Sequence, residues 1–111
     1  MSFAAIIRSS IILIILGLTL LLGSSTGKIT GRIVDAETEK PLPGCNIIVN
    51  NTVLGSSSDI DGYFTFYNIP PGIYSIRAQM IGYAEMVYTD VVVNIDLTTT
   101  IDFNLNVKVL E

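Results

Sequence analysis

From residue 28 onward, hydrophobic and polar residues alternate with a period of two, which is the pattern of β-strands. The alternation predicts strands over residues 29–34, 45–49, 53–58, 63–67, 74–80, 83–93 and 101–109. It is clearest in the last stretch, where one face holds Ile101, Phe103, Leu105, Val107 and Val109 and the other holds Asp102, Asn104, Asn106 and Lys108. One-sided alternation of this kind indicates two sheets that each bury one face.

Turn residues separate these stretches. Asp61-Gly62 provides a glycine for the left-handed position of a tight turn. Pro70-Pro71-Gly72 predicts the next turn, because proline presets φ and glycine frees it. Asn50-Asn51 suits a hairpin turn, since asparagine tolerates positive φ. With no helical pattern in this part of the chain, we expect an all-β fold, an antiparallel β-sandwich of six or seven strands.

The N-terminal part follows a different pattern. Arg8 precedes an apolar run over residues 11–22, and the small residues 23–27 come directly after it. This order is typical of a secretory signal peptide, and a cut after Ser25 or Gly27 would fit. The alternative is an uncleaved membrane anchor, although the run is shorter than the ~20 residues that span a bilayer. No cysteine stands near the exit, which argues against a lipid-anchored protein.

We therefore divide the chain into residues 1–27, the signal peptide or anchor, and residues 28–111, an exported domain. Without Arg8 the domain keeps five of the six basic residues against ten acidic ones, a balance that argues against nucleic-acid binding. The lone cysteine, Cys45, alternates in phase with Ile47 and Val49. We expect it to be a buried apolar residue rather than a reactive thiol.

The residues predict no catalytic site. The chain has no histidine, so neither a Ser-His-Asp nor a Cys-His arrangement can form. Asp59 and Asp61 are weak candidates for a metal site, because Asp-x-Asp-Gly occurs in calcium loops. An EF-hand loop needs glycine at its sixth position and glutamate at its twelfth, whereas here glycine is fourth and Pro70 is twelfth. We interpret the two acids as caps of a β-turn and expect no cofactor.

Four tyrosines, Tyr63, Tyr67, Tyr83 and Tyr88, are the remaining surface candidates. Aromatic side chains are favoured at interfaces. They also pack against cross-strand neighbours within a sandwich, so both interpretations stay open.

Five motifs in order carry a family resemblance: Gly31-Arg32-Ile33-Val34-Asp35, Pro41-Leu42-Pro43-Gly44-Cys45-Asn46-Ile47, Asp59-Ile60-Asp61-Gly62-Tyr63-Phe64, Ile69-Pro70-Pro71-Gly72-Ile73-Tyr74 and Ile81-Gly82-Tyr83. From residue 28 to about residue 109 the chain resembles the carboxypeptidase regulatory-like domain. The resemblance implies a transthyretin-like (prealbumin-like) sandwich of seven strands. The chain departs from the family pattern at Ser58, where threonine is common, and at Cys45, where valine or alanine is usual.

The resemblance also implies a non-catalytic role. In metallocarboxypeptidases such a domain follows the catalytic unit and carries no zinc. In exported bacterial proteins similar domains follow the signal peptide and precede the plug and barrel of TonB-dependent receptors. The order here looks like the second arrangement. We therefore predict the N-terminal periplasmic extension of a TonB-dependent outer-membrane receptor, which docks another periplasmic or outer-membrane protein.

Two alternatives stay open. One is a stand-alone, secreted carbohydrate-binding or protein-binding adhesion module, since similar sandwiches are used in that way. The other is the accessory domain of a zinc carboxypeptidase whose catalytic part is absent from this chain.

Overall fold

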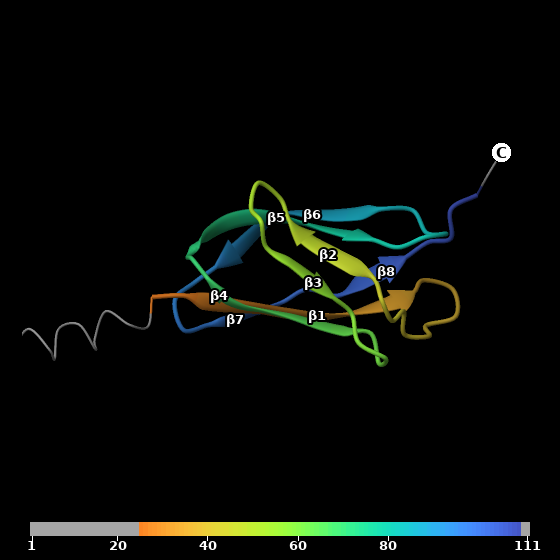
Figure 1. The fold of residues 1–111 in the computed structure, drawn as a ribbon, viewed down its shortest axis with the longest axis horizontal. Helices are drawn as coiled ribbons and strands as arrows, with labels where there is room; N and C mark the ends of the chain where they lie inside the picture. The colour runs from red at the N-terminus through yellow and green to blue at the C-terminus, as the bar shows by residue number, and fades with distance from the viewer. Residues whose placement is uncertain (1–24, 110–111) are drawn as a thin grey trace, which may run out of the picture.

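The computed structural model describes residues 25–109, which form two β-sheets packed face to face (Figure 1). Residues 1–24, which hold most of the predicted signal peptide, lie outside the described residues. The first sheet contains β4 (Tyr63–Ile69), β1 (Gly27–Asp35), β7 (Thr98–Thr100) and β8 (Phe103–Leu105). The second contains β3 (Gly55–Ser57), β2 (Asn46–Val49), β5 (Gly72–Gln79) and β6 (Met86–Val93). The predicted all-β sandwich is confirmed.

One side of the first sheet differs from the antiparallel expectation. Both β7 and β8 pair with β1 in parallel, while every other named strand pair is antiparallel. The chain leaves β6 in the second sheet and crosses to the first sheet before it begins β7. Periodicity along a chain reports which face of a strand is buried, but it does not report the direction of the neighbouring strand.

The predicted last strand, residues 101–109, is shortened to β8, and the unpredicted strand β7 lies before it, which gives eight strands rather than seven among the described residues. Between β7 and β8, the Asp102 carboxylate accepts a hydrogen bond from the Arg32 backbone N–H at 3.0 Å. A side chain thereby takes the place of a ladder partner, and the regular pairing stops for two residues.

The inward placement of Val107 and Val109 is wrong. Their exposed fractions are 56% and 78%, whereas Ile101, Phe103 and Leu105 are buried as expected. The reason is that β1 ends at Asp35, which pairs with Leu105. Beyond that pair no neighbouring β1 residue and no opposite sheet face remain for the valines to pack against.

The core lies between the two sheets and is built from one face of each strand. Its centre is a group of aromatic rings around Phe103, whose ring centroid lies 5.9 Å from that of Phe64 and 5.0 Å from that of Tyr88. Cys45, Ile47 and Val49 are fully buried in the same core, as the alternation predicts. Their burial confirms that Cys45 is a packed side chain, and it raises the pKa of the thiol.

Side-chain hydroxyls connect the two sheets along both open sides of the sandwich. The Ser56 hydroxyl on β3 donates to the Thr65 carbonyl on β4 at 3.2 Å. On the other side, the Thr99 hydroxyl on β7 donates to the Val92 carbonyl on β6 at 2.9 Å. Each bond satisfies a carbonyl on an edge strand that would otherwise be free to pair with another chain.

Two predicted turns depend on different residues. Gly62 has a φ of +83°, and a Cβ there would lie 2.5 Å from the Ile33 carbonyl oxygen, so glycine is required at this position. Gly72 does not have a positive φ and is the first residue of β5, so the Pro70-Pro71-Gly72 turn does not use the conformational freedom of glycine. The positive φ near this turn belongs to Asn68, at 55°, within β4.

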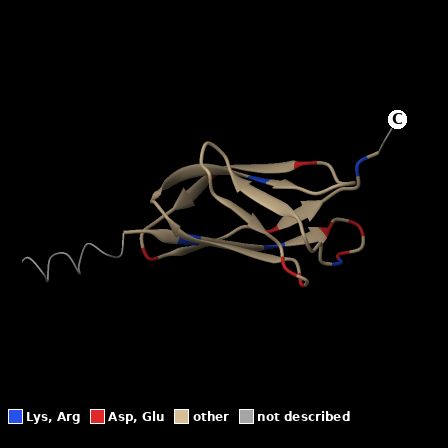
Figure 2. Cartoon of the chain, viewed as in Figure 1, with Lys and Arg blue, Asp and Glu red and all other residues tan. Residues whose placement is uncertain are grey.

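The two ends of the sandwich differ in charge. Figure 2 shows most acidic residues of the described chain at the end opposite its N-terminal start, and the loop over residues 36–40 and the turn over 59–61 supply four of them. The described chain begins at one end of the sandwich and finishes at the other (Figure 1). Among residues 25–109 there is no helix of the length and apolarity that a membrane crossing requires.

Candidate interaction groove

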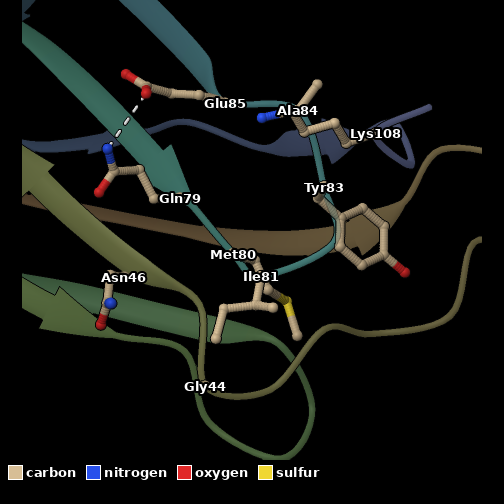
Figure 3. A pocket seen from close by; sticks show the side chains of 9 residues that line it. All are labelled: Gly44, Asn46, Gln79, Met80, Ile81, Tyr83, Ala84, Glu85 and Lys108. Carbon is tan, nitrogen blue, oxygen red and sulfur yellow. Dashed lines mark hydrogen bonds between the residues drawn. The ribbon is translucent and has the colours of Figure 1, made fainter. Parts of the chain in front are cut away.

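A groove of about 640 Å³ opens at the end of the sandwich opposite residue 25 (Figure 3). It lies between the start of β2 and the segment that joins β5 to β6. Its lining residues are Gly44, Asn46, Gln79, Met80, Ile81, Tyr83, Ala84, Glu85 and Lys108.

The groove's apolar wall is a tight turn after β5. The Tyr83 N–H donates to the Met80 carbonyl at 3.1 Å, and Gly82 has a φ of +88°. No atom lies within 4 Å of a Cβ built at Gly82, so glycine is needed there for its backbone conformation and not for space. The turn leaves the Ile81 side chain 99% exposed.

The C-terminal segment holds this turn in place. The Ala84 N–H donates to the Asn106 carbonyl at 2.8 Å, and the Lys108 N–H donates to the Gly82 carbonyl at 2.9 Å. Val107 forms an isolated antiparallel bridge with Tyr83. The residues that follow β8 therefore form one edge of the groove instead of extending the core.

Asp35 holds the hydroxyl end of the Tyr83 side chain. Its carboxylate is 8% exposed and accepts a hydrogen bond from the Tyr83 hydroxyl at 2.8 Å. The other oxygen accepts from the backbone N–H groups of Glu37 at 2.8 Å and Thr38 at 3.0 Å. One carboxylate thereby ties the acidic loop over residues 36–40 to the wall of the groove.

These contacts shift both pKa values in the Asp35–Tyr83 pair. The Thr38 N–H, the Tyr83 hydroxyl and the Glu37 N–H hold the pKa of Asp35 below its ordinary 3.8, although burial opposes them. The hydrogen bond to Asp35, followed by burial, raises the pKa of Tyr83 above its ordinary 10.0.

The pair should make stability fall at both ends of the pH range. Asp35 contributes stability above pH 3.8, and this is lost as pH falls through its lowered pKa in the folded state. Tyr83 contributes stability below pH 10.0, and this is lost as pH rises through its raised pKa. Thermal unfolding from pH 2 to 11 should show a weaker acid decline in Asp35→Asn and a weaker alkaline decline in Tyr83→Phe. Slopes equal to the parent's would contradict the assignment.

The groove's rim is polar. Glu85 accepts a hydrogen bond from the Gln79 side-chain amide at 3.2 Å, and its other oxygen lies 3.4 Å from Nε of Arg77. Figure 3 shows the Gln79–Glu85 bond above the apolar wall formed by Met80 and Ile81. An apolar floor with a few oriented polar groups at its edge is the usual make-up of a recognition site.

The predicted acids Asp59 and Asp61 lie in the β-turn before β4. The Asp59 carboxylate accepts from the N–H groups of Asp61 at 3.0 Å and Tyr63 at 2.9 Å, and the Gly62 N–H donates to the Asp59 carbonyl at 2.9 Å. This is the turn-capping geometry that the sequence predicts. Within residues 25–109 no three acidic or cysteine side chains gather where they could hold a metal ion. A weak ion site at these two acids stays an untested prediction.

The four tyrosines divide into two kinds. Tyr63 and Tyr67 are exposed on the outer face of β4, where Arg32 and Lys28 lie 5.3 Å and 5.2 Å from the respective ring centroids. Tyr83 and Tyr88 are half-buried and pack against the core. The structure therefore places Tyr83 at the groove, whereas Tyr63 and Tyr67 lie outside it.

Sequence reasoning does not identify two residues of the groove, Ile81 and Glu85, or Asp35, which holds the groove residue Tyr83. Asp35 continues the inward phase of Ile29 and Ile33, but an acidic residue at the end of a strand pattern is ordinarily expected in solvent. Ile81 and Glu85 belong to a connection whose shape depends on the C-terminal segment, which lies far away in the sequence. The Ile81-Gly82-Tyr83 motif is the one local signal, because it marks the turn.

Solved structures with the same fold include proteins from several bacteria. One is the Bacillus anthracis TIE protein (TM-score 0.64, 21% identity, covering 75% of this chain and 17% of that chain). Another is the major pilin subunit of Bacillus cereus (TM-score 0.59, 20% identity, covering 76% and 31%). A third is a type II cohesin–X-dockerin complex from Acetivibrio cellulolyticus (TM-score 0.57, 16% identity, covering 69% and 52%). At these identities the likeness shows the fold alone, and the chain spans about half or less of each.

No curated protein matches the chain. The model of the CarboxypepD_reg-like domain family does match, over residues 29–111. This range includes all five motifs on which the resemblance rests and every strand except the first two residues of β1. The chain therefore belongs to the CarboxypepD_reg-like domain family.

Proposed function

We propose that this chain is an exported, non-catalytic interaction module that docks a partner protein in the groove around Ile81. The observation that carries the proposal is the exposure of Ile81, 99%, at the edge of a concave surface. Single exposed apolar residues are common. Here Met80 and Ala84 line the same hollow, so a partner could bury one continuous apolar surface.

The charges around the groove indicate the partner's chemistry. In the described part of the chain, the loop tied down by Asp35 carries Glu37 and Glu39 without a basic partner on the rim, whereas Glu85 is paired with Arg77 and Lys108 lines the same groove. Opposite charges across an interface speed association and fix its orientation. The partner surface should therefore carry an apolar side chain flanked by lysine or arginine.

The finer proposal is the N-terminal periplasmic extension of a TonB-dependent outer-membrane receptor. It is supported by the family, by the signal-like segment before the sandwich, and by the position of residue 25 and Val109 at opposite ends. An extension of this shape holds the groove beside whatever follows it in the chain. A plug and barrel encoded after residue 111 agree with this proposal. A zinc peptidase there, or a stop codon in the gene, overturns it and favours an accessory domain or a stand-alone binding module.

Docking in the groove is tested by site-specific photocross-linking in the native host. A photoreactive phenylalanine analogue at position 81 should cross-link to one periplasmic or outer-membrane protein, which mass spectrometry identifies. The matched control is position 53, because Val53 is also fully exposed, at 103%, but lies outside the groove.

A substitution gives the second measurement. With the photoreactive group at position 84, Ile81→Asp should reduce the cross-linked product at least about tenfold. Burying an isoleucine side chain is worth about 1.5–3 kcal/mol, and 1.4 kcal/mol corresponds to a factor of ten in affinity. Val53→Asp should leave the product unchanged. Equal yields from positions 81 and 53, or equal losses in both variants, would sink the groove as the docking site.

A further inference from the structure

A second hollow of about 330 Å³ lies at the other end of the sandwich, where the described chain begins. Thr26, Lys28, Asn68 and Asp96 are among the residues that line it. The groove proposal does not use this site. It bears on how the N-terminal segment is removed, which the sequence leaves open.

Residues 23–27 contain two possible cleavage positions, because a signal peptide has small residues one and three positions before the cut. Gly23 and Ser25 satisfy the rule for a cut after Ser25, while Ser25 and Gly27 satisfy it for a cut after Gly27. Local sequence does not separate the two.

The structure separates them because Thr26 and Gly27 are parts of the fold. The Thr26 carbonyl accepts from the Asp96 N–H at 2.9 Å, and its hydroxyl lies 3.5 Å from the Asn68 side-chain oxygen. Gly27 is buried and pairs with Ile69 at the start of β1. A Cβ at Gly27 would lie 2.4 Å from the Asn94 carbonyl oxygen, so the chain passes here through a narrow space.

Ser25 differs from both residues. It is exposed and takes part in none of the hydrogen bonds of the described chain. A cut after Ser25 therefore leaves the hydrogen bonds among residues 26–109 intact. A cut after Gly27 removes the contacts that join the end of β4, through Asn68, to the β6–β7 turn, through Asp96.

We infer that a peptidase of the export machinery hydrolyses the Ser25–Thr26 bond and that the new α-amino group lies in the hollow beside Asp96. One water molecule is consumed, Ser25 leaves as the carboxylate end of the signal peptide, and Thr26 becomes an α-ammonium. Lys28 lines the same hollow, but its Nζ lies 5.2 Å from the centroid of the Tyr67 ring. Asp96 supplies the negative charge that a second cation requires.

The full chain, expressed in a bacterial host and exported, should have the intact mass of residues 26–111. Gly23→Leu removes a small residue that a cut after Ser25 needs, but it leaves both small residues that a cut after Gly27 needs. Its product should remain unprocessed, or should begin at Lys28 and unfold at least about 4 °C lower. A parent product that begins at Lys28, or a parent chain that keeps residues 1–25, overturns the inference.

The role of Asp96 is tested by a double-mutant cycle. Ser25→Leu removes a small residue that both cleavage positions need, so the peptide bond between residue 25 and Thr26 is kept. Asp96→Asn should lower the unfolding temperature more in the processed protein than in the Ser25→Leu background, with both measured in the same detergent. Equal shifts in the two backgrounds would show that Asp96 does not pair with the new amino group.

Discussion

Replacing Gly31 with alanine should lower the free energy of unfolding by about 3 kcal/mol or more. Gly31 lies in the middle of β1, and a Cβ there would lie 1.7 Å from the Ile101 carbonyl oxygen and 2.8 Å from the Phe64 ring. A carbonyl of the neighbouring chain segment cannot rotate away as a flexible side chain can. The short segment between β7 and β8, which contains Ile101, would have to separate from β1.

The matched control is Gly55→Ala on β3. The atom nearest to a Cβ there is the Ile47 carbonyl oxygen at 3.8 Å, an ordinary contact, and φ is not positive. Since alanine restricts the unfolded chain, this variant should be neutral or stabilised by up to about 1 kcal/mol. Urea unfolding followed by circular dichroism measures both variants. A Gly31→Ala protein within 1 kcal/mol of the parent would show that the two segments approach less closely.

Replacing Phe103 with alanine should cost about 3–5 kcal/mol. The ring is fully buried and contacts Phe64 in its own sheet and Tyr88 from the opposite sheet. A domain of this size has roughly 4–13 kcal/mol of stability in all, so the variant should be partly or wholly unfolded at 37 °C.

Phe103→Leu keeps this prediction measurable, because it retains much of the apolar volume and should fold with a smaller loss. Asn104→Ala is the control, since Asn104 is the exposed neighbour on the same strand. The expected order of unfolding temperatures is Asn104→Ala, then Phe103→Leu, then Phe103→Ala. If Phe103→Ala unfolds at the temperature of the control, the aromatic group is not the centre of the core.

Most of the fold follows from local patterns. Alternation in β1, β2, β4 and β5 reports which side chains are buried, because a residue and its second neighbour always point to the same face of a strand. The Asp61-Gly62 turn is equally local, because its hydrogen bonds connect residues within four positions of each other. The family motifs combine these local signals in a fixed order.

The misplaced elements depend on distant partners. Val107 and Val109 continue the alternation of β8, but β1 has already ended, and Val107 has only an isolated bridge to Tyr83. Whether β7 runs parallel or antiparallel to β1 is a property of the crossing from the other sheet. Neither is visible in the spacing of apolar residues, which is the same for a paired strand and an unpaired extended segment.

The groove shows the same contrast between features set by neighbours in the chain and features set by distant contacts. Sequence alone determines that this chain is an all-β domain without histidine chemistry, with its turns at the observed positions, because these properties depend on composition and on neighbours in the chain. The recognition surface depends on contacts across the whole domain. Asp35 and Tyr83 are separated by 48 positions, and Ala84 and Asn106 come from segments that meet after both sheets have formed. Tertiary packing therefore decides where Ile81 is exposed and which charges surround it.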